Sequence, residues 1–94
     1  MNIRRILLDV DKAISRPSLF DLVEAISGVS GVEVVNVTVT EIDLETVGMN
    51  VTVEGTSIDH EGLIAAIETA GAVVNSIDQV IAGDRIIDDV PRSR

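Results

Sequence analysis

Residues 32 to 56 constrain the fold more than any other part of the chain, because apolar and polar side chains alternate along them. Alternation at period two is typical of a half-buried strand, since successive side chains point to opposite faces. The alternation is interrupted by an acidic corner, Glu41-Ile42-Asp43-Leu44-Glu45. The stretch therefore predicts a β-hairpin with one aliphatic face, formed by Val35, Val37, Val39, Val47, Met49, Val51 and Val53.

Helices and further strands are expected on both sides of this hairpin. Ser18, with Asp21 three positions later, matches the capping box that begins a helix, and Asp59 is a second N-cap residue. Gly28 and Gly71 follow the two apolar stripes, and glycine ends helices because it adopts the left-handed conformation at little cost. The remaining elements are predicted at residues 3–11 (strand), 18–27 (helix), 59–70 (helix) and 72–82 (strand).

The order of the elements is strand, helix, strand, strand, helix, strand. Each strand–helix–strand half crosses over right-handed, which predicts an α+β, ferredoxin-like βαββαβ fold. The expected four-stranded antiparallel sheet has the order 4-1-3-2, with both helices on one face. In the last strand, Ile77 and Ile81 are expected to share a face. The prediction is a single domain over residues 1–94, with its core at about 3–83 and a C-terminal extension at 84–94.

Composition and charge exclude several classes of function. The chain has no cysteine and one histidine, which excludes disulfides, thiolate chemistry and typical zinc sites. Its formal net charge is −9, and no Lys or Arg occurs between Arg16 and Arg85, so nucleic acid and anionic membranes are not expected partners. No apolar run is long enough to span a membrane, and Asp9 and Asp11 argue against a signal peptide. We expect a cytoplasmic protein without a catalytic constellation.

The acidic corner is the first candidate site. Glu41, Asp43 and Glu45 lie at alternate positions, and carboxylates that converge on a bend are ligands for Ca²⁺ or Mg²⁺. The alternative is that the corner pairs with Arg4 and Arg5. This alternative assumes that the first strand runs parallel to the second strand of the hairpin, which would place the corner near the start of the chain. The sequence leaves both interpretations open.

A second candidate site combines Asp9, Asp78 and Arg85. Asp9 and Asp78 are expected on neighbouring strands of the open sheet face, where a carboxylate that another subunit covers needs a partner. Arg85 of a neighbouring copy is the expected partner, which makes this group a subunit interface. A role in holding a ligand is the alternative.

Four short motifs occur in one order along the chain: Glu41-Ile-Asp-Leu-Glu-Thr46, Gly55-x-x-x-Asp59, Ile67-Glu68-x-x-Gly71 and Ser76-x-Asp78-x-Val80-x-Ala82-Gly83. In these motifs and their spacings the chain resembles the domain of unknown function 211 family, small archaeal proteins with a ferredoxin-like fold. The resemblance extends from Ile3 to Gly83. It implies an archaeal, cytoplasmic protein that assembles into a homo-oligomer such as a ring. It also implies a divalent cation such as calcium as a ligand of the acidic residues.

These observations support three hypotheses for function. The leading one is a non-enzymatic, homo-oligomeric binding or assembly module that binds divalent cations through carboxylates. A Thr- and Val-rich sheet face and the apolar segment Ile86-Ile87 favour burial against another copy. The alternative is a regulatory module that holds a small effector at a subunit interface. An enzyme with an active site assembled across subunits from Asp and Arg is the third.

Overall fold

The structure, a computed structural model, describes residues 1–88 of the chain. Its elements are β1 (Ile3–Ala13), α1 (Leu19–Ser27), β2 (Val32–Ile42), β3 (Thr46–Gly55), α2 (His60–Ala70) and β4 (Val73–Ala82). This order confirms the sequence prediction, although β1 continues to Ala13 where the prediction ended it at Asp11. The end of the expected C-terminal extension, residues 89–94, lies outside the described residues. No helix in residues 1–88 is long and apolar enough to cross a membrane.

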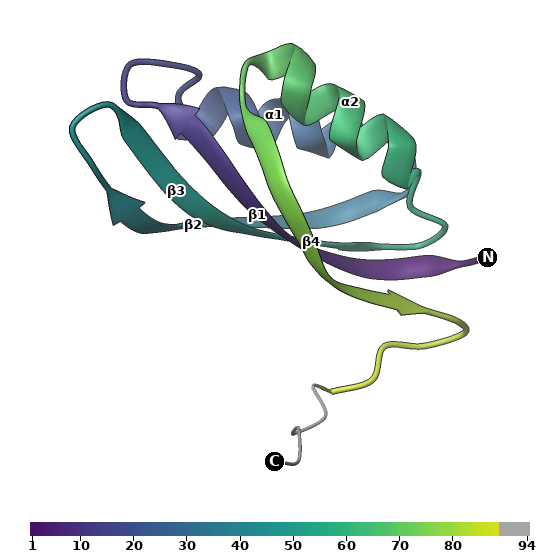
Figure 1. The fold of residues 1–94 in the computed structure, drawn as a ribbon. Helices are drawn as coiled ribbons and strands as arrows, with labels where there is room; N and C mark the ends of the chain where they lie inside the picture. The colour runs from purple at the N-terminus through teal and green to yellow at the C-terminus, as the bar shows by residue number, and fades with distance from the viewer. Residues whose placement is uncertain (89–94) are drawn as a thin grey trace, which may run out of the picture.

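The strands form one four-stranded antiparallel sheet in the order β2-β3-β1-β4. This is the predicted order 4-1-3-2, counted from the opposite edge. Figure 1 shows both helices on one face of the sheet, whereas the opposite face carries no helix. The chain therefore has the ferredoxin-like α+β fold that its order of elements predicts.

Each helix begins at a side chain that binds a free backbone N–H group. The Asp21 N–H donates to the Ser18 hydroxyl at 3.0 Å, and the Ser18 N–H donates to the Asp21 carboxylate at 3.4 Å, which is the predicted capping box. At α2 the Gly62 N–H donates to the Asp59 carboxylate at 3.1 Å. Since the first N–H groups of a helix lack partners within it, these contacts fix where α1 and α2 start.

The two helices end differently. Gly71 follows α2 in the left-handed conformation, with a φ of 104°, as predicted. Gly28 was expected to do the same after α1, but its φ is −79°. The left-handed residue comes later, at Gly31, where φ is 90°. A Cβ at Gly31 would also lie 2.5 Å from the Thr56 carbonyl oxygen, so this position accepts only glycine.

Aliphatic side chains fill the space between the sheet and the helices. Alternate residues of β1 and β3 point to the helices, and each helix contributes one apolar stripe. The largest fully buried side chains are Ile6, Leu8, Val10, Leu22, Ile26, Met49, Val51, Val53, Leu63 and Ile67. Because β1 and β3 are the central strands, the core lies over them, and the edge strands β2 and β4 are mostly exposed.

Strand β4 does not keep the predicted alternation. Its register with β1 skips Asn75 and Asp78, which mark bulges. Each bulge adds one residue to β4 and changes the face of the residues that follow. Ile77 consequently pairs with Leu8 on the helix-covered face, so the prediction that it shares a face with Ile81 is wrong.

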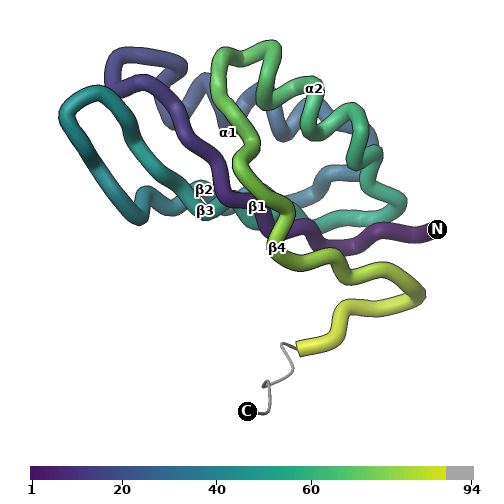
Figure 2. Tube along the Cα trace, in the orientation of Figure 1, coloured from purple at the N-terminus to yellow at the C-terminus, as the bar shows by residue number. Residues whose placement is uncertain are grey.

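Hydrogen bonds join the start of β1 to the end of β4. Ile3 pairs with Ala82, and the Gly83 N–H donates to the Asn2 carbonyl at 2.8 Å. Figure 2 shows the start of β1 beside the end of β4, and the chain after β4 turning away from the helices. The segment from Asp84 to Asp88 is exposed throughout, so it adds nothing to the core.

The core account predicts a large effect at Leu8, which is 1% exposed in the central strand β1. Leu8→Ala should lower the free energy of unfolding by about 2–5 kcal/mol, because it removes buried methyl groups and leaves a cavity. Urea unfolding followed by circular dichroism measures the change. Leu44→Ala is the matched control, since Leu44 is 92% exposed, and it should change stability by less than about 0.5 kcal/mol. Equal losses in the two variants would contradict the account.

Candidate functional site

The register places one polar row across the middle of the helix-free face. Asp9 on β1 pairs with Asn50 on β3 and with Ser76 on β4, and Asn50 pairs in turn with Thr38 on β2. Asp9 is half-buried, whereas the other members of the row are exposed. The row therefore presents a carboxylate flanked by an amide and a hydroxyl in the centre of the uncovered face.

The acidic corner lies at the end of β1 and not at its start. β1 and β3 are antiparallel, and Ala13, the last residue of β1, pairs with Thr46 beside the corner. The crossover through α1 makes β1 run in the direction of β2, and the hairpin then reverses the chain before β3. The prediction that β1 and β3 are parallel is therefore wrong. The alternative that the corner pairs with Arg4 and Arg5 is also wrong, because these two residues lie at the opposite end of the sheet.

Arg4 and Arg5 have partners at that opposite end. Arg5 Nε donates to Glu54 Oε2 at 2.9 Å, with side chains that are 18% and 34% exposed. Arg4 Nε donates to the Gly83 carbonyl oxygen at 2.8 Å. A partly exposed ion pair of this kind contributes roughly 0.2–1 kcal/mol, so we assign both arginines to the structure of the sheet end.

Glu41, Asp43 and Glu45 do not converge in the single chain. The Asp43 carboxylate accepts the Leu44 N–H at 2.7 Å, and the Asp43 N–H donates to the Thr46 carbonyl at 2.8 Å, so Asp43 closes the hairpin turn. Each of the acidic side chains is exposed. Within residues 1–88, no group of three or more His, Cys, Asp or Glu side chains is arranged to hold a metal ion. The cation site at the corner stays a prediction.

The structure brings Glu41 close to Asp11 instead. Both residues pair with Gly48, one from each side of β3. A Cβ on Gly48 would lie 3.5 Å from Asp11 Oδ1 and 3.5 Å from Glu41 Cβ, so glycine leaves the space between the two acids open. The alternation of β2 alone does not predict this pair, because the register skips Thr40 and thereby moves Glu41 to the helix-free face.

The second predicted group is brought together only in part. Ser76 pairs with Asp9, and its hydroxyl donates to Asp78 Oδ1 at 2.8 Å, so the two acids lie on either side of one serine. Arg85 lies beyond the end of β4 and is exposed. Within residues 1–88 it forms no ion pair with either acid. Contact between Arg85 and these acids of a neighbouring copy stays a prediction.

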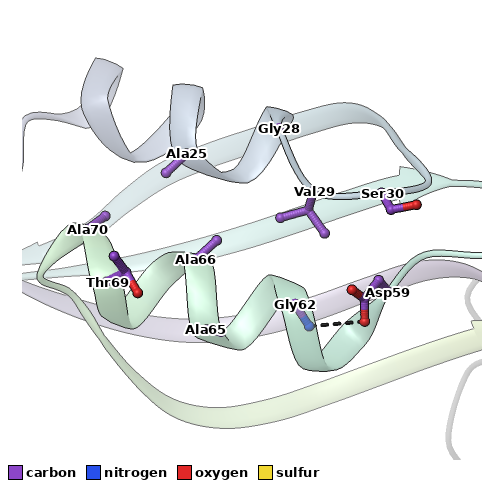
Figure 3. A pocket seen from close by; sticks show the side chains of 10 residues that line it. All are labelled: Ala25, Gly28, Val29, Ser30, Asp59, Gly62, Ala65, Ala66, Thr69 and Ala70. Carbon is purple, nitrogen blue, oxygen red and sulfur yellow. Dashed lines mark hydrogen bonds between the residues drawn. The ribbon is translucent and has the colours of Figure 1, made fainter.

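A groove of about 560 Å³ lies between α1 and α2. Figure 3 shows the small side chains along it and the Asp59 carboxylate turned to the Gly62 N–H. Because that carboxylate caps α2, the lining offers a ligand no unused charged group, and we assign the groove no function. The residues that line it are Ala25, Gly28, Val29, Ser30, Asp59, Gly62, Ala65, Ala66, Thr69 and Ala70.

Lys12 is a buried charged residue, although the sequence predicts it in the connection after the first strand. Because β1 continues past Asp11, Lys12 falls on the helix-covered face, two residues after Val10, and is only 8% exposed. Its Nζ donates to the carbonyl oxygens of Ala13 at 3.0 Å and of Ile14 at 3.2 Å. Extending the period-two alternation of β1 by one more pair of residues would have revealed this inward position.

Lys12 lines a hollow of about 480 Å³ at the end of the sheet, beside the acidic corner. The end of β1 and the starts of β3 and β4 form its walls, together with Gly71 from the turn after α2. The lining contains charged residues of both signs, whereas the charged residue that lines the groove between the helices, Asp59, caps α2. Its polar members are Asp11, Lys12, Glu45, Thr46 and Asn75.

Two comparisons with known proteins agree with each other. The sequence model of the domain of unknown function 211 family, described as uncharacterized ArCR, matches residues 4–94. An uncharacterized protein of the archaeon Methanocaldococcus jannaschii is 41% identical over 88 residues, which cover 94% of this chain and 90% of that protein. Neither description indicates an enzymatic activity.

The cation prediction for the acidic corner has a direct test. Binding of Ca²⁺ or Mg²⁺ to the folded chain should raise its melting temperature by mass action, and Glu41→Gln combined with Asp43→Asn should abolish the rise. Differential scanning calorimetry with and without metal measures both effects. Glu61→Gln, on the exposed first turn of α2, is the control that should keep the rise. An unchanged melting curve at about 5 mM metal would remove the cation site.

Proposed function

The chain belongs to the domain of unknown function 211 family, and we propose that it is a non-enzymatic subunit of a cytoplasmic homo-oligomer that assembles through the exposed edge of β2. The supporting observation is the state of that edge. β2 is eleven residues long, and none of its residues is buried. It has no Lys or Pro, and it is uncharged from Val34 to Thr40.

An edge of this kind favours pairing with another strand. The outer N–H and C=O groups of an edge strand are a template for a further chain, and soluble proteins usually protect such edges with Lys, Pro or bulges. β2 departs from regular pairing with β3 only at Glu33 and Thr40. Between them, the residues from Val34 to Val39 keep a regular register, and Val34 is 58% exposed. This regular segment of β2 is the proposed assembly surface.

The other edge of the sheet is less suited to assembly. β4 is exposed as well, but its register with β1 is irregular at Asn75 and Asp78. Bulges bend a strand and disrupt the ladder, so they hinder a partner from pairing along it. Asp78 also places a charge in the middle of the strand. The difference between the edges supports assembly of β2 with β2 of a second copy.

Charge selects the register of that pairing. In an antiparallel pair centred on Val37, Glu33 of each copy would lie opposite Glu41 of the other, and like charges in direct opposition are destabilising. A pair centred on Asn36 avoids this opposition and keeps polar residues on the face without helices. We therefore propose a two-fold pair centred on Asn36, which joins two sheets into one.

A regulatory, effector-binding module is the second candidate function. The observation that favours it is the hollow beside Lys12, which contains charged groups of both signs. Such a module needs a concave site with a few polar groups that orient a ligand, and the hollow has such groups.

The assembly proposal predicts that Thr38→Lys dissociates the oligomer. Thr38 is exposed on the β2 edge, two residues from the proposed two-fold axis, and a lysine within an edge strand opposes its pairing with another strand. Light scattering coupled to size-exclusion chromatography should show an oligomer for the unmodified chain at roughly 10 µM and a monomer for the variant.

Thr69→Lys is the matched control for this experiment. It makes the same substitution at an exposed position of α2, far from the β2 edge in the sequence, and should leave the assembly intact. Circular dichroism checks that both variants fold. A monomeric unmodified chain, or an oligomer that survives Thr38→Lys, would overturn the proposed assembly.

A further inference from the structure

The outer side of α1 carries apolar side chains that the single chain leaves uncovered. Phe20, the only aromatic residue of the protein, is 88% exposed, and Leu19 beside it is 36% exposed. Val23, about one turn later, is only partly buried. We call these three residues the outer stripe of α1. A group of neighbouring exposed apolar side chains, unlike a single one, indicates a surface that another molecule covers.

The outer stripe faces away from the second helix. Successive residues of a helix are about 100° apart, so the three members of the stripe lie roughly 120–160° around α1 from Ala25. Ala25 lines the groove between α1 and α2, as Figure 3 shows. Leu22 and Ile26 are the buried residues of α1 and belong to the core. Phe20 therefore points neither to α2 nor to the core.

The outer stripe lies beside the edge of β2. Of the two helices, α1 packs on β2 and α2 packs on β4, and these strands are the two edges of the sheet. Since α2 lies on the β4 side of α1, the opposite side of α1 is turned to the open edge of β2. The stripe is thus continuous with the proposed assembly surface.

The proposed assembly surface is small on its own. The segment from Val34 to Val39 is about 20 Å long and a sheet is about 10 Å thick, so its edge covers on the order of 200 Å². A specific interface buries about 800 Å² on each partner. One buried aromatic side chain adds about 150–250 Å². Stable assembly through β2 therefore needs an additional contact next to the strands.

The two-fold pair centred on Asn36 brings the two α1 helices together. The two-fold axis of an antiparallel strand pair is perpendicular to the sheet, so both copies carry their helices on the same face. Paired strands are about 4.8 Å apart, and each α1 packs on its own β2, so the two helices approach to within about 10 Å. Packed helices are about 8–10 Å apart. The spacing of the strands therefore suits direct contact between the helices.

We propose that the outer stripe of α1 packs against the same stripe of a second copy, with Phe20 as the buried anchor of the contact. This inference rests on assembly through β2 and names the second surface of that interface. The stripe contains no charged residue, so two copies with a net charge of −9 each can approach there with little repulsion. Aromatic anchors next to a two-fold axis are a common source of binding free energy in interfaces.

Fluorescence of the Phe20→Trp variant tests whether this position is covered. The chain has no Trp or Tyr, so the introduced indole reports on position 20 alone. At roughly 10 µM its emission should lie at the short wavelengths of an indole shielded from water. Addition of Thr38→Lys to this variant should shift the emission to the long wavelengths of an exposed indole, because Phe20 is exposed in the single chain. Light scattering on the same samples gives the oligomeric state.

Phe20→Ala tests whether the contact stabilises the assembly. It should raise the dissociation constant by about tenfold or more, because truncation of an aromatic anchor removes much of the binding free energy. Sedimentation velocity over a series of concentrations measures the change. Val73→Ala is the control, since Val73 is 57% exposed on β4 at the other edge of the sheet, and it should leave the dissociation constant unchanged.

The outcomes separate this inference from the proposed assembly. A monomeric unmodified chain would overturn both. An oligomer in which the Phe20→Trp variant emits as an exposed indole would overturn the α1 contact alone, and this is also the result expected if a different protein covers the stripe. An unchanged dissociation constant after Phe20→Ala would likewise overturn the α1 contact and leave assembly through β2 in place.

Discussion

The aliphatic layer between the sheet and the two helices is the interaction on which the structure depends. It is built from β1, β3 and one stripe of each helix, and its ten largest fully buried members lie in these elements. A domain of this size buries a smaller share of its surface than a larger one, so few kcal/mol separate the folded from the unfolded chain. The layer uses only one face of the sheet, which leaves the other face and both edges uncovered.

The two surfaces for which a function is proposed lie where this aliphatic layer ends. The edge strand β2 lies beside the core but has no buried residue, so further burial is available there only from another chain. Lys12 lies at the end of the inward row of β1, where the aliphatic side chains give way to carbonyl oxygens and a polar hollow. One surface thus supports contact with a second copy and the other supports contact with a small molecule.

The sequence predicted the elements, the sheet order and the helix caps, because these depend on local periodicity and on side-chain chemistry near the helix ends. It did not predict the faces of Ile77 and Glu41, since each depends on a bulge that inserts one residue into a strand. The predicted direction of β3 relative to β1 was wrong, although the antiparallel direction follows from the topology itself. Lys12 was missed because the end of β1 was set two residues too early.

Amide hydrogen exchange at two protein concentrations tests most directly whether β2 is the assembly surface. The account predicts that outward-pointing amides between Val34 and Thr40 exchange slowly in the concentrated sample and fast in the dilute one. Amides of β4 should exchange alike in both samples. Fast exchange of the β2 amides at every concentration, or protection that appears on β4 instead, would contradict the account.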